Sequence, residues 1–240
     1  AHTPEPIPEN LTQISDLMKD GKADVGFVVD PDVDRLAIVM ENGEMFVEEY
    51  TLVAVADYIL RHTPGATVSN LSSSRALGDV TRSYGCEYHA SAVGEVNVVA
   101  KMKETGAVIG GEGNGGVIYP EAHYGRDALV GVAIFLTLLA KSGKKVSELK
   151  KEYPSYAIAK NKIELTPDIN VDAILCAMKE RYADEKITDM DGVKIDFQDS
   201  WVHLRKSNTE PIIRIYAEAP TMAAAERLGE KVKSVIASLA

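Results

Sequence analysis

Short apolar runs and helix-like stretches take turns along the first 145 residues, and this alternation limits the possible fold more than any other feature. The strand-like runs are Val25–Val29, Thr67–Leu71, Glu87–Ala90 and Ala107–Ile109. The helix-like stretches between them are Tyr50–Arg61, Arg75–Tyr84 and Val96–Glu104. Strands and helices that alternate in this way form βαβ units, so the pattern predicts an α/β domain with a mixed, mainly parallel sheet.

The pattern changes after Lys151–Tyr156, a linker in which Pro154 cannot continue a helix. Beyond the linker, Val193–Phe197 and Ile212–Ala219 alternate apolar with polar residues, as half-buried antiparallel strands do. Pro220 then starts a closing helix, whose apolar stripe contains Leu228, Val232, Val235, Ile236 and Leu239. This part is predicted to be a smaller α+β domain, in which two helices cover one face of an antiparallel sheet.

Length and composition agree with two domains. The chain has 240 residues, and its hydrophobic fraction of 45% is sufficient to fill two cores. We expect the tail of a preceding domain at residues 1–22, the α/β domain at 23–150 and the α+β domain at 155–240. The opening segment AHTPEPIPEN is rich in proline and lacks an initiator methionine, so we interpret the sequence as part of a longer chain.

Charge and cysteine content exclude several classes of protein. The net charge of -10 argues against sequence-independent binding of nucleic acid, which needs a basic surface. The 2 cysteines form neither a disulfide framework nor a zinc pattern. The longest apolar run, Ala128–Ala140, is shorter than the ~20 residues that cross a bilayer, and no signal-like segment opens the chain. We therefore expect a cytoplasmic protein with no nucleic-acid partner and no membrane contact.

Three aspartates occupy alternate positions in DPDVDR, directly after the first strand-like run: Asp30, Asp32 and Asp34. On an extended loop, residues i, i+2 and i+4 project to the same side. Three carboxylates on one side form a hard-oxygen site suited to Mg²⁺ or Ca²⁺. Because α/β sheets bind ligands beyond the carboxyl ends of their strands, the position of this loop also indicates a site.

Two alternatives to a magnesium site follow from the same residues. An EF-hand loop would use the three aspartates and Glu41, but Arg35 stands where that loop needs a glycine, and strand-like runs replace the flanking helices. A solvated acidic turn fits the spacing alone. Arg35 favours a ligand site, because a cation beside an anionic cluster suits a phosphate ester that bridges metal and guanidinium. Phosphoryl chemistry is therefore the leading hypothesis.

Two further loops carry groups that bind hydroxyls and phosphates. Gly110–Pro120 is rich in glycine, and its Glu112 and Asn114 can hydrogen-bond hydroxyl groups, although a flexible turn is the alternative. A second loop offers cations and neutral donors between two strands: Arg205, Lys206, Ser207, Asn208, Thr209 and Arg214. Such a cluster can hold a phosphate dianion by charge-assisted hydrogen bonds, but an exposed polar hairpin has the same composition.

Three motifs resemble loops of the α-D-phosphohexomutase superfamily, which includes phosphoglucomutase and phosphomannomutase, and they occur in the family order. The metal loop is resembled by DPDVDR, the sugar-recognition loop by GEGNGG and the phosphate-binding loop by RKSNTEPIIR. The opening PEPIPENL resembles the end of the second of four family domains. The resemblance covers essentially the whole chain. It implies that the chain corresponds to domains three and four, the carboxyl-terminal part of such a mutase.

The resemblance also implies roles for individual residues. The Mg²⁺ ligands would be Asp30, Asp32 and Asp34, and Arg35 would be a catalytic residue beside the reacting phosphate. The sugar would be contacted by Glu112, Asn114 and, in VGEVN, Glu95. The phosphate remote from the chemistry would be held by Arg205, Ser207, Asn208, Thr209 and Arg214.

Three features depart from the family pattern. Pro31 and Val33 replace the glycines that are usual between the aspartates, which should stiffen the loop without removing a ligand. Gly116 stands where many members carry a histidine, so acid–base chemistry by a histidine is unavailable at that position. The phosphoserine nucleophile of the family has no counterpart here, and we interpret the serines of Ser72–Arg75 as helix caps.

The function implied by the resemblance is intramolecular phosphoryl transfer between C1 and C6 of hexose phosphates through a bisphosphate intermediate. Mg²⁺ would be the cofactor, and a sugar 1,6-bisphosphate the activator. Through the same resemblance, the motif SNTEP implies glucose and mannose phosphates rather than glucosamine phosphate. The missing amino-terminal domains of the same chain would be a partner, so the isolated chain is expected to be inactive. The alternative is a non-catalytic sugar-phosphate-binding protein.

Overall fold

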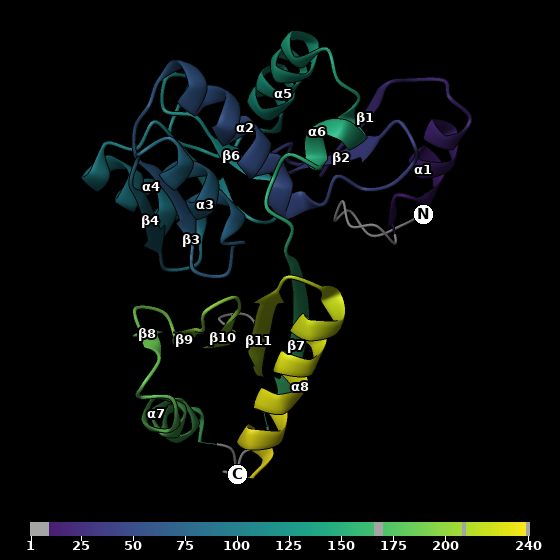
Figure 1. Ribbon diagram of the computed structural model, residues 1–240. Coiled ribbons are helices and arrows are strands. Elements are labelled where there is room, and N and C mark those ends of the chain that lie inside the picture. The colour runs from purple at the N-terminus through teal and green to yellow at the C-terminus, as the bar shows by residue number, and fades with distance from the viewer. Residues whose placement is uncertain (1–9, 166–169, 208–209, 239–240) are drawn as a thin grey trace. The chain divides into compact units, whose positions relative to one another are not determined.

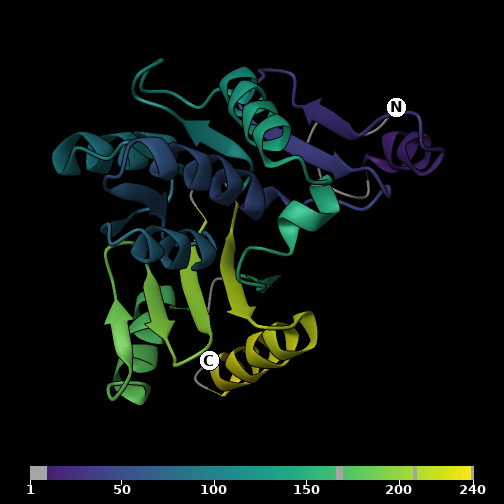
Figure 2. The same cartoon turned by 45° about the horizontal axis from the view of Figure 1, so that its top comes forward.

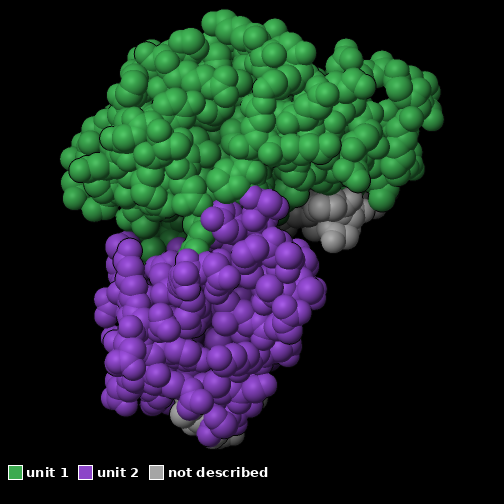
Figure 3. Space-filling view, in the orientation of Figure 1, with its two compact units in different colours: residues 1–154 green, residues 155–240 purple. Residues whose placement is uncertain are grey.

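A computed structural model describes residues 10–165, 170–207 and 210–238 of the chain (Figure 1). The chain divides into two compact units, Ala1–Pro154 and Ser155–Ala240 (Figure 3). Asn208, Thr209 and Leu239, which the sequence places in the phosphate loop and the closing helix, lie outside the described residues. None of the helices in the described ranges is both long and apolar enough to cross a bilayer.

The centre of the first unit is a four-stranded sheet in the order β4-β3-β5-β6. Its strands are β3 (Thr67–Asn70), β4 (Tyr88–Ser91), β5 (Ile109–Glu112) and β6 (Gly116–Ile118). The central strand β3 is parallel to both β4 and β5, whereas β6 is antiparallel to β5. The predicted α/β fold with a mixed, mainly parallel sheet is therefore confirmed.

Helices cover both faces of this sheet. They are α2 (Glu48–His62), α3 (Ala76–Ser83), α4 (Glu95–Thr105) and α5 (Ala128–Ser142). Successive residues of a strand face opposite sides. On β5, a Cβ at Gly110 would point toward Met102 of α4, and a Cβ at Gly111 would point toward Leu52 of α2. The helices α4 and α2 therefore pack on opposite faces, which fixes the loop after β5 between them.

A separate hairpin precedes this sheet. The strands β1 (Val25–Val29) and β2 (Leu36–Met40) pair antiparallel as a two-stranded sheet, next to α1 (Thr12–Lys19). The expectation that the first strand belongs to the parallel sheet is wrong. A parallel partner needs a long crossover, whereas the short loop Asp30–Arg35 returns the chain directly to the side of β1. The aspartates therefore lie in a hairpin connection.

Aromatic packing joins this hairpin to α5. The ring of Phe135 is fully buried and makes edge-to-face contacts with Phe27 of β1 and with Phe46, at centroid distances of 6.1 Å and 5.3 Å. Edge-to-face geometry suits the opposite charge of ring edges and faces. The contact holds the hairpin, and with it the aspartate loop, against the helix that follows the glycine-rich loop.

The second unit is a five-stranded antiparallel sheet in the order β7-β11-β10-β9-β8 (Figure 2). Its elements are β7 (Ala157–Glu164), α7 (Val171–Arg181), β8 (Lys186–Thr188), β9 (Val193–Asp196), β10 (Trp201–Lys206), β11 (Ile212–Ala219) and α8 (Met222–Ala237). Side chains of both helices, including Met178 of α7 and Val232 of α8, share one core with β9, β10 and β11. The predicted antiparallel sheet with one face under two helices is confirmed.

The closing helix begins where the sequence indicates. The side chain of Thr221 accepts a hydrogen bond from the N–H of Ala224, which is the usual role of a threonine before the first helical residue. Of the predicted apolar stripe, Val232, Val235 and Ile236 are buried, and Leu228 packs against the same core.

We expect the second unit to lose stability in acid because of His203 on β10. This side chain is 1% exposed and donates from Nε2 to the carbonyl oxygen of Asp191 at 2.6 Å. Burial lowers the pKa of His203 to about 4. An unfolded histidine has a pKa of about 6.5, so between these values the unfolded chain binds more protons, and stability falls as the pH falls.

The expected loss from His203 between pH 7 and pH 4.5 is about 2.5 kcal/mol. Urea unfolding followed by the fluorescence of Trp201, on the same strand, measures it in the native protein and in His203→Gln. The glutamine keeps a donor but does not titrate, so its loss over this range should be smaller by that amount. Equal losses in both proteins would contradict the prediction.

Candidate metal and phosphate sites

The structure brings the three aspartates together in the β1–β2 loop. One carboxylate oxygen from each of Asp30, Asp32 and Asp34 lies within 4.8 Å of the other two. Asp30 is buried at the end of β1, Asp32 is exposed and Asp34 is intermediate. The cluster thus has a buried base and an open side, which is the arrangement that a bound cation with remaining water or substrate ligands needs.

Backbone N–H groups hold the innermost carboxylate. Asp30 Oδ1 accepts hydrogen bonds from the N–H of Asp34 at 3.1 Å and from that of Arg35 at 3.0 Å. Burial by itself would raise the pKa of Asp30, but these hydrogen bonds and the Arg35 guanidinium outweigh it and lower the pKa below its usual value. Asp30 therefore stays ionised inside the loop.

The backbone of the loop is strained at Val33. Its φ is 59°, in the left-handed region, which a β-branched residue rarely adopts and which costs about 1–2 kcal/mol. The carbonyl oxygen of Val33 accepts a hydrogen bond from the N–H of Ala128 at the start of α5, at 3.1 Å. The stiffer loop expected from Val33 thus takes the form of a fixed, strained turn. Strain of this kind concentrates at functional sites.

Asp34 provides the test of whether a metal ion fits. Its Oδ2 accepts from Arg126, but its buried Oδ1 has no hydrogen-bond partner among the described residues. Burial raises the pKa of Asp34, and the neighbouring carboxylates of Asp30 and Asp32 add to this effect. A divalent cation would satisfy Oδ1 and neutralise the repulsion, so this donor set fits Mg²⁺. Asp30, Asp32 and Asp34 would hold it.

Arg35 lies at the edge of the aspartate cluster. Its Nε is 3.4 Å from Asp30 Oδ2 and 3.7 Å from Asp34 Oδ1. The side chain is 32% exposed, so part of the guanidinium faces solvent. The structure thus places a cation beside the cluster, and its contact with a reacting phosphate stays a prediction.

The glycine-rich loop places Glu112 in a buried network. The side chain is 4% exposed, and its Oε1 accepts from Asn70 Nδ2 at 2.7 Å and from the N–H of Gly94 at 3.2 Å. Asn114, in contrast, is half-buried, and its Oδ1 accepts from the N–H of Gly116 at 3.1 Å. Both oxygens of Glu112 accept from the protein, the second from Arg126. Sugar contacts by these two residues stay predictions.

Arg126 is the residue that sequence reasoning missed. Its side chain is 14% exposed and contacts three carboxylates: Nη2 bonds Asp34, Nη1 is 2.8 Å from Glu112 Oε2, and Nε is 3.5 Å from Glu95 Oε2. Its backbone N–H also donates to Glu95 Oε1 at 2.9 Å. One guanidinium therefore joins the aspartate loop, the glycine-rich loop and Glu95. The only signal in the sequence was Gly116, where a side chain is missing.

Two glycines of this loop are required by close approach. A Cβ at Gly116 would lie 2.4 Å from Cδ of Arg126. Gly115 has a φ of +90°, and a Cβ there would lie 2.4 Å from the carbonyl oxygen of Leu36. The N–H of Leu36 donates to the oxygen of Gly115 at 3.0 Å, so the glycine-rich loop touches the start of β2 directly. The two loops are therefore in direct contact.

The serines of Ser72–Arg75 support the glycine-rich loop more than they cap a helix. Ser73 Oγ donates to Asn70 Oδ1 at 3.1 Å and accepts from the N–H of Gly113 at 3.0 Å. Ser74 Oγ accepts from the N–H of Ala76 at 3.1 Å, a contact typical of a capping serine. The residue directly before α3 is Arg75, and its side chain makes no capping hydrogen bond. The interpretation as caps is therefore wrong for Ser73, and for Ser74 it rests on the contact with Ala76 alone.

In the second unit, two arginines face each other across neighbouring strands. Arg205 of β10 and Arg214 of β11 are directly opposite in the ladder, so their side chains project from the same face. Arg205 Nε is buried without a hydrogen-bond partner among the described residues, while Arg214 Nη2 donates to Glu210 Oε2 at 2.5 Å. Ser207 is buried. The structure thus brings Arg205 and Arg214 together, and their contact with a phosphate stays a prediction.

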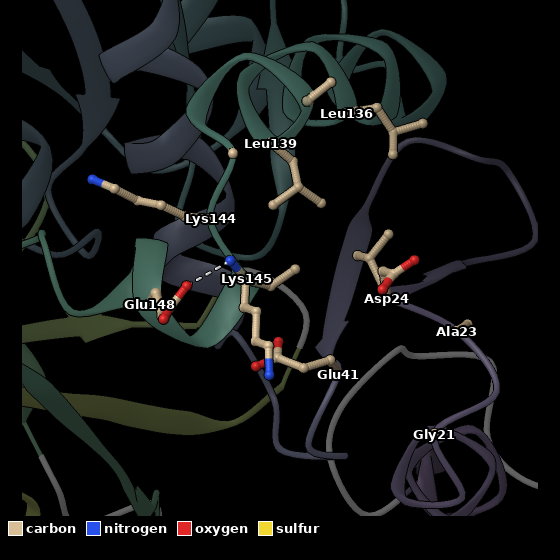
Figure 4. Close-up of a pocket in the computed structure, with 13 residues that line it drawn as sticks. Gly21, Ala23, Asp24, Glu41, Leu136, Leu139, Lys144, Lys145 and Glu148 are labelled. Carbon is tan, nitrogen blue, oxygen red and sulfur yellow. Dashed lines mark hydrogen bonds between the residues drawn. The ribbon is translucent and has the colours of Figure 1, made fainter.

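A pocket of about 820 Å³ lies at the other end of the β1–β2 hairpin (Figure 4). It is bordered by Asp24, Glu41 and residues of α5 and of α6 (Val146–Lys150). Burial by itself would raise the pKa of Glu41, but hydrogen bonds donated by Ser147 outweigh it and lower the pKa below its usual value. Lys145, which extends toward Glu41 in Figure 4, adds to this lowering. The pocket is separated from the aspartate loop by the length of the strands.

Three family models match the chain in sequence order. Residues 1–43 match phosphoglucomutase/phosphomannomutase, alpha/beta/alpha domain II, and residues 48–156 match alpha/beta/alpha domain III. Residues 158–235 match the C-terminal domain of the same family. The prediction that the chain corresponds to domains three and four is therefore incomplete. The match to domain II runs through the aspartate loop and β2.

Individual relatives agree with these matches. A phosphoglucomutase/phosphomannomutase of Thermococcus kodakarensis is 39% identical over 220 residues, which cover 91% of this chain and 48% of that protein. A probable phosphoglucosamine mutase of Methanopyrus kandleri is 34% identical over 235 residues, 97% of this chain and 52% of that protein.

This chain superposes on the crystal structure of a phosphoglucomutase/phosphomannomutase family protein from Burkholderia thailandensis with a TM-score of 0.86 at 28% identity. The superposition covers 100% of this chain and 52% of that protein. The chain thus spans about half the length of the relatives that it matches. Three domain models in family order, together with these relatives, show that the chain belongs to the α-D-phosphohexomutase superfamily.

Proposed function

We propose that this chain is the metal-binding and substrate-binding part of a phosphohexomutase that moves a phosphoryl group between C1 and C6 of glucose or mannose phosphates. The observation that carries the proposal is the junction at Arg126. It brings a three-aspartate cluster and a glycine-rich loop, which are far apart in sequence, to one place. Homologues named as phosphoglucomutases, phosphomannomutases and phosphoglucosamine mutases support the reaction class but leave the sugar open.

The chain's own residues supply charge and position for this chemistry. Mg²⁺, when bound at Asp30, Asp32 and Asp34, would neutralise charge on the transferring phosphoryl group. Arg35 at the edge of the cluster would contact the oxygens of the same group, since a guanidinium matches phosphate geometry. Asn114, which is half-buried, would meet sugar hydroxyls. The phosphoryl donor is expected from another part of the whole protein, with a sugar 1,6-bisphosphate as intermediate and activator.

The second unit would hold the phosphate that does not react. Arg205 and Arg214 project from one face, as two groups that grip one dianion must. Arg214 would leave its exposed partner Glu210 to do so, at small energetic cost because exposed ion pairs contribute little. Both ends of a bisphosphate must fit this site in turn, so several donors around one cationic centre suit the task better than a rigid, shape-specific pocket.

The metal assignment predicts that Mg²⁺ binds and that Asp32→Asn weakens binding on the order of tenfold, because charged oxygen ligands set the affinity of such sites. Asp32 is exposed, so its replacement should not disturb the fold. Calorimetric titration of both proteins measures the difference, with exposed Asp24→Asn as a matched control that should bind like the native chain. Indistinguishable curves for the native chain and Asp32→Asn would remove the metal site.

The phosphate assignment predicts that Arg205→Lys weakens sugar-phosphate binding. Lysine keeps the charge but loses the planar fork, at a cost of about 1.5 kcal/mol, roughly tenfold in affinity. Nuclear magnetic resonance titration with glucose 6-phosphate measures it. Arg181→Lys, an exposed change at the end of α7, is the control and should have no effect. An Arg205→Lys affinity equal to that of the control would show an ordinary polar hairpin.

A further inference from the structure

Arg126 contacts acidic side chains of both loops, Asp34 of the aspartate loop and Glu112 of the glycine-rich loop. Around it lie five carboxylates, those of the three aspartates and of Glu95 and Glu112, and one other guanidinium, that of Arg35. The fork of an arginine can bond several carboxylates at once from a fixed plane, which a lysine ammonium cannot do with the same geometry. The arrangement therefore depends on this residue type.

The contact of Arg126 with Asp34 is one-sided. Arg126 takes Oδ2 and leaves Oδ1 toward the aspartate cluster, where Oδ1 lacks a hydrogen-bond partner among the described residues. Groups that bond one oxygen of a ligand carboxylate fix the direction of the other oxygen. Arg126 thus selects which oxygen of Asp34 faces the cluster and prevents the carboxylate from turning.

Gly116 makes room for this contact. The stem of Arg126 occupies the space of a Cβ at Gly116, with Cδ at 2.4 Å from the position of that atom. Any side chain at residue 116 would therefore displace the guanidinium from both Asp34 and Glu112. Residue 116 must be a glycine because the side chain of Arg126 passes through the space that a Cβ would occupy.

We propose that Arg126 is a positioning residue that fixes Asp34 as a one-oxygen metal ligand and couples metal binding to the geometry of the glycine-rich loop. The inference rests on the proposed function, because it takes the aspartate cluster as the metal site. A cation that binds Asp34 changes the position of this carboxylate and therefore of the guanidinium bonded to it. The same guanidinium bonds Glu112 through Nη1 at 2.8 Å. The geometry of the glycine-rich loop then changes when the metal binds.

The two loops are also connected through backbone hydrogen bonds, and their effect can be separated from that of the Arg126 side chain. Leu36 donates to Gly115, and Ala128 donates to Val33, so backbone hydrogen bonds also connect the segments. These bonds do not involve the Arg126 side chain and survive its replacement. A change at the glycine-rich loop that persists without the guanidinium would therefore have travelled through the backbone.

The test is a Mg²⁺ titration of the whole chain, read by calorimetry and by amide resonances, for the native protein, Arg126→Lys and Gly116→Ala. Arg126→Lys keeps the charge and loses the fork, and Gly116→Ala keeps Arg126 but displaces it. Both should bind Mg²⁺ on the order of tenfold more weakly, as replacement of groups that orient metal ligands typically does. Amide resonances of residues 113, 115 and 116 should shift with Mg²⁺ in the native chain but not in Arg126→Lys or Gly116→Ala.

Gly78→Ala is the matched control, since its nearest contact is the flexible tip of Arg82 at 3.0 Å, in helix α3. It should titrate like the native chain. If Arg126→Lys or Gly116→Ala keeps native affinity, or keeps the glycine-loop shifts, the coupling by Arg126 is overturned while the metal site stands. If native chain and Asp32→Asn titrate alike, the metal site and this inference are overturned together.

Discussion

Replacement of Phe135 by alanine is expected to lower the free energy of unfolding by about 3–5 kcal/mol, as loss of a buried phenylalanine from a packed core does. The ring is fully buried and makes edge-to-face contacts with Phe27 and Phe46. The substitution removes both contacts and leaves a cavity between α5 and the β1–β2 hairpin. Because this packing holds the aspartate loop in place, Mg²⁺ affinity should fall as well.

Urea unfolding followed by circular dichroism measures the effect of Phe135→Ala. The next residue supplies a control on the same helix: Leu136 is 42% exposed, and Leu136→Ala should stay within about 0.5–1 kcal/mol of the native chain. A similar small change for Phe135→Ala would mean that the hairpin does not depend on α5 for its position.

Replacement of Asp57 by alanine is expected to cost about 3 kcal/mol, because hydrogen bonds to a buried charge contribute about 1.5–3 kcal/mol each. Asp57 on α2 is 5% exposed and accepts from the hydroxyls of Tyr84 at 2.6 Å and Tyr153 at 3.0 Å. Burial and the Asp57 carboxylate raise the pKa of Tyr153 far above its usual value, so this hydroxyl remains a donor. Arg61 also donates to both oxygens of Asp57, at 3.3 Å and 2.5 Å, and its contribution is included in this cost.

The contribution of a single hydrogen bond to Asp57 can be measured with a smaller substitution. Tyr153→Phe removes one hydrogen bond and should cost about half as much as Asp57→Ala. The control is Asp16→Ala, which breaks an exposed helical pair with Lys19 and should cost less than about 0.5 kcal/mol. Urea unfolding of the three variants gives the ranking. An Asp57→Ala cost as small as that of Asp16→Ala would show that these hydroxyls find other partners.

Local features of the sequence were sufficient to place most elements of the fold. The first strand, Val25–Val29, has the predicted bounds, because an apolar run that ends at an acidic loop leaves little freedom. The sheet to which it belongs could not be predicted in the same way. A short apolar strand looks alike in a parallel sheet and in a hairpin, and only the pairing with β2 separates the two.

The candidate site shows the same limit. The spacing of the aspartates is local, so the cluster at Asp30, Asp32 and Asp34 could be predicted from five consecutive positions. Arg126 could not, because its contact with Asp34 spans 92 positions and its neighbours form no motif. The burial of Glu112 likewise comes from Asn70 and Gly94, which reach it from other strand ends.

The proposed function requires that the aspartate loop, the glycine-rich loop and the Arg205–Arg214 segment each take part in binding a phosphosugar. The most direct measurement is a nuclear magnetic resonance titration of the chain with glucose 1,6-bisphosphate in the presence of Mg²⁺. Amide shifts are expected to concentrate in Asp30–Arg35, in Glu112–Gly116 and in Arg205–Arg214, and to be larger than those caused by inorganic phosphate. Shifts outside these three segments, or equal shifts for bisphosphate and inorganic phosphate, would contradict the proposed function.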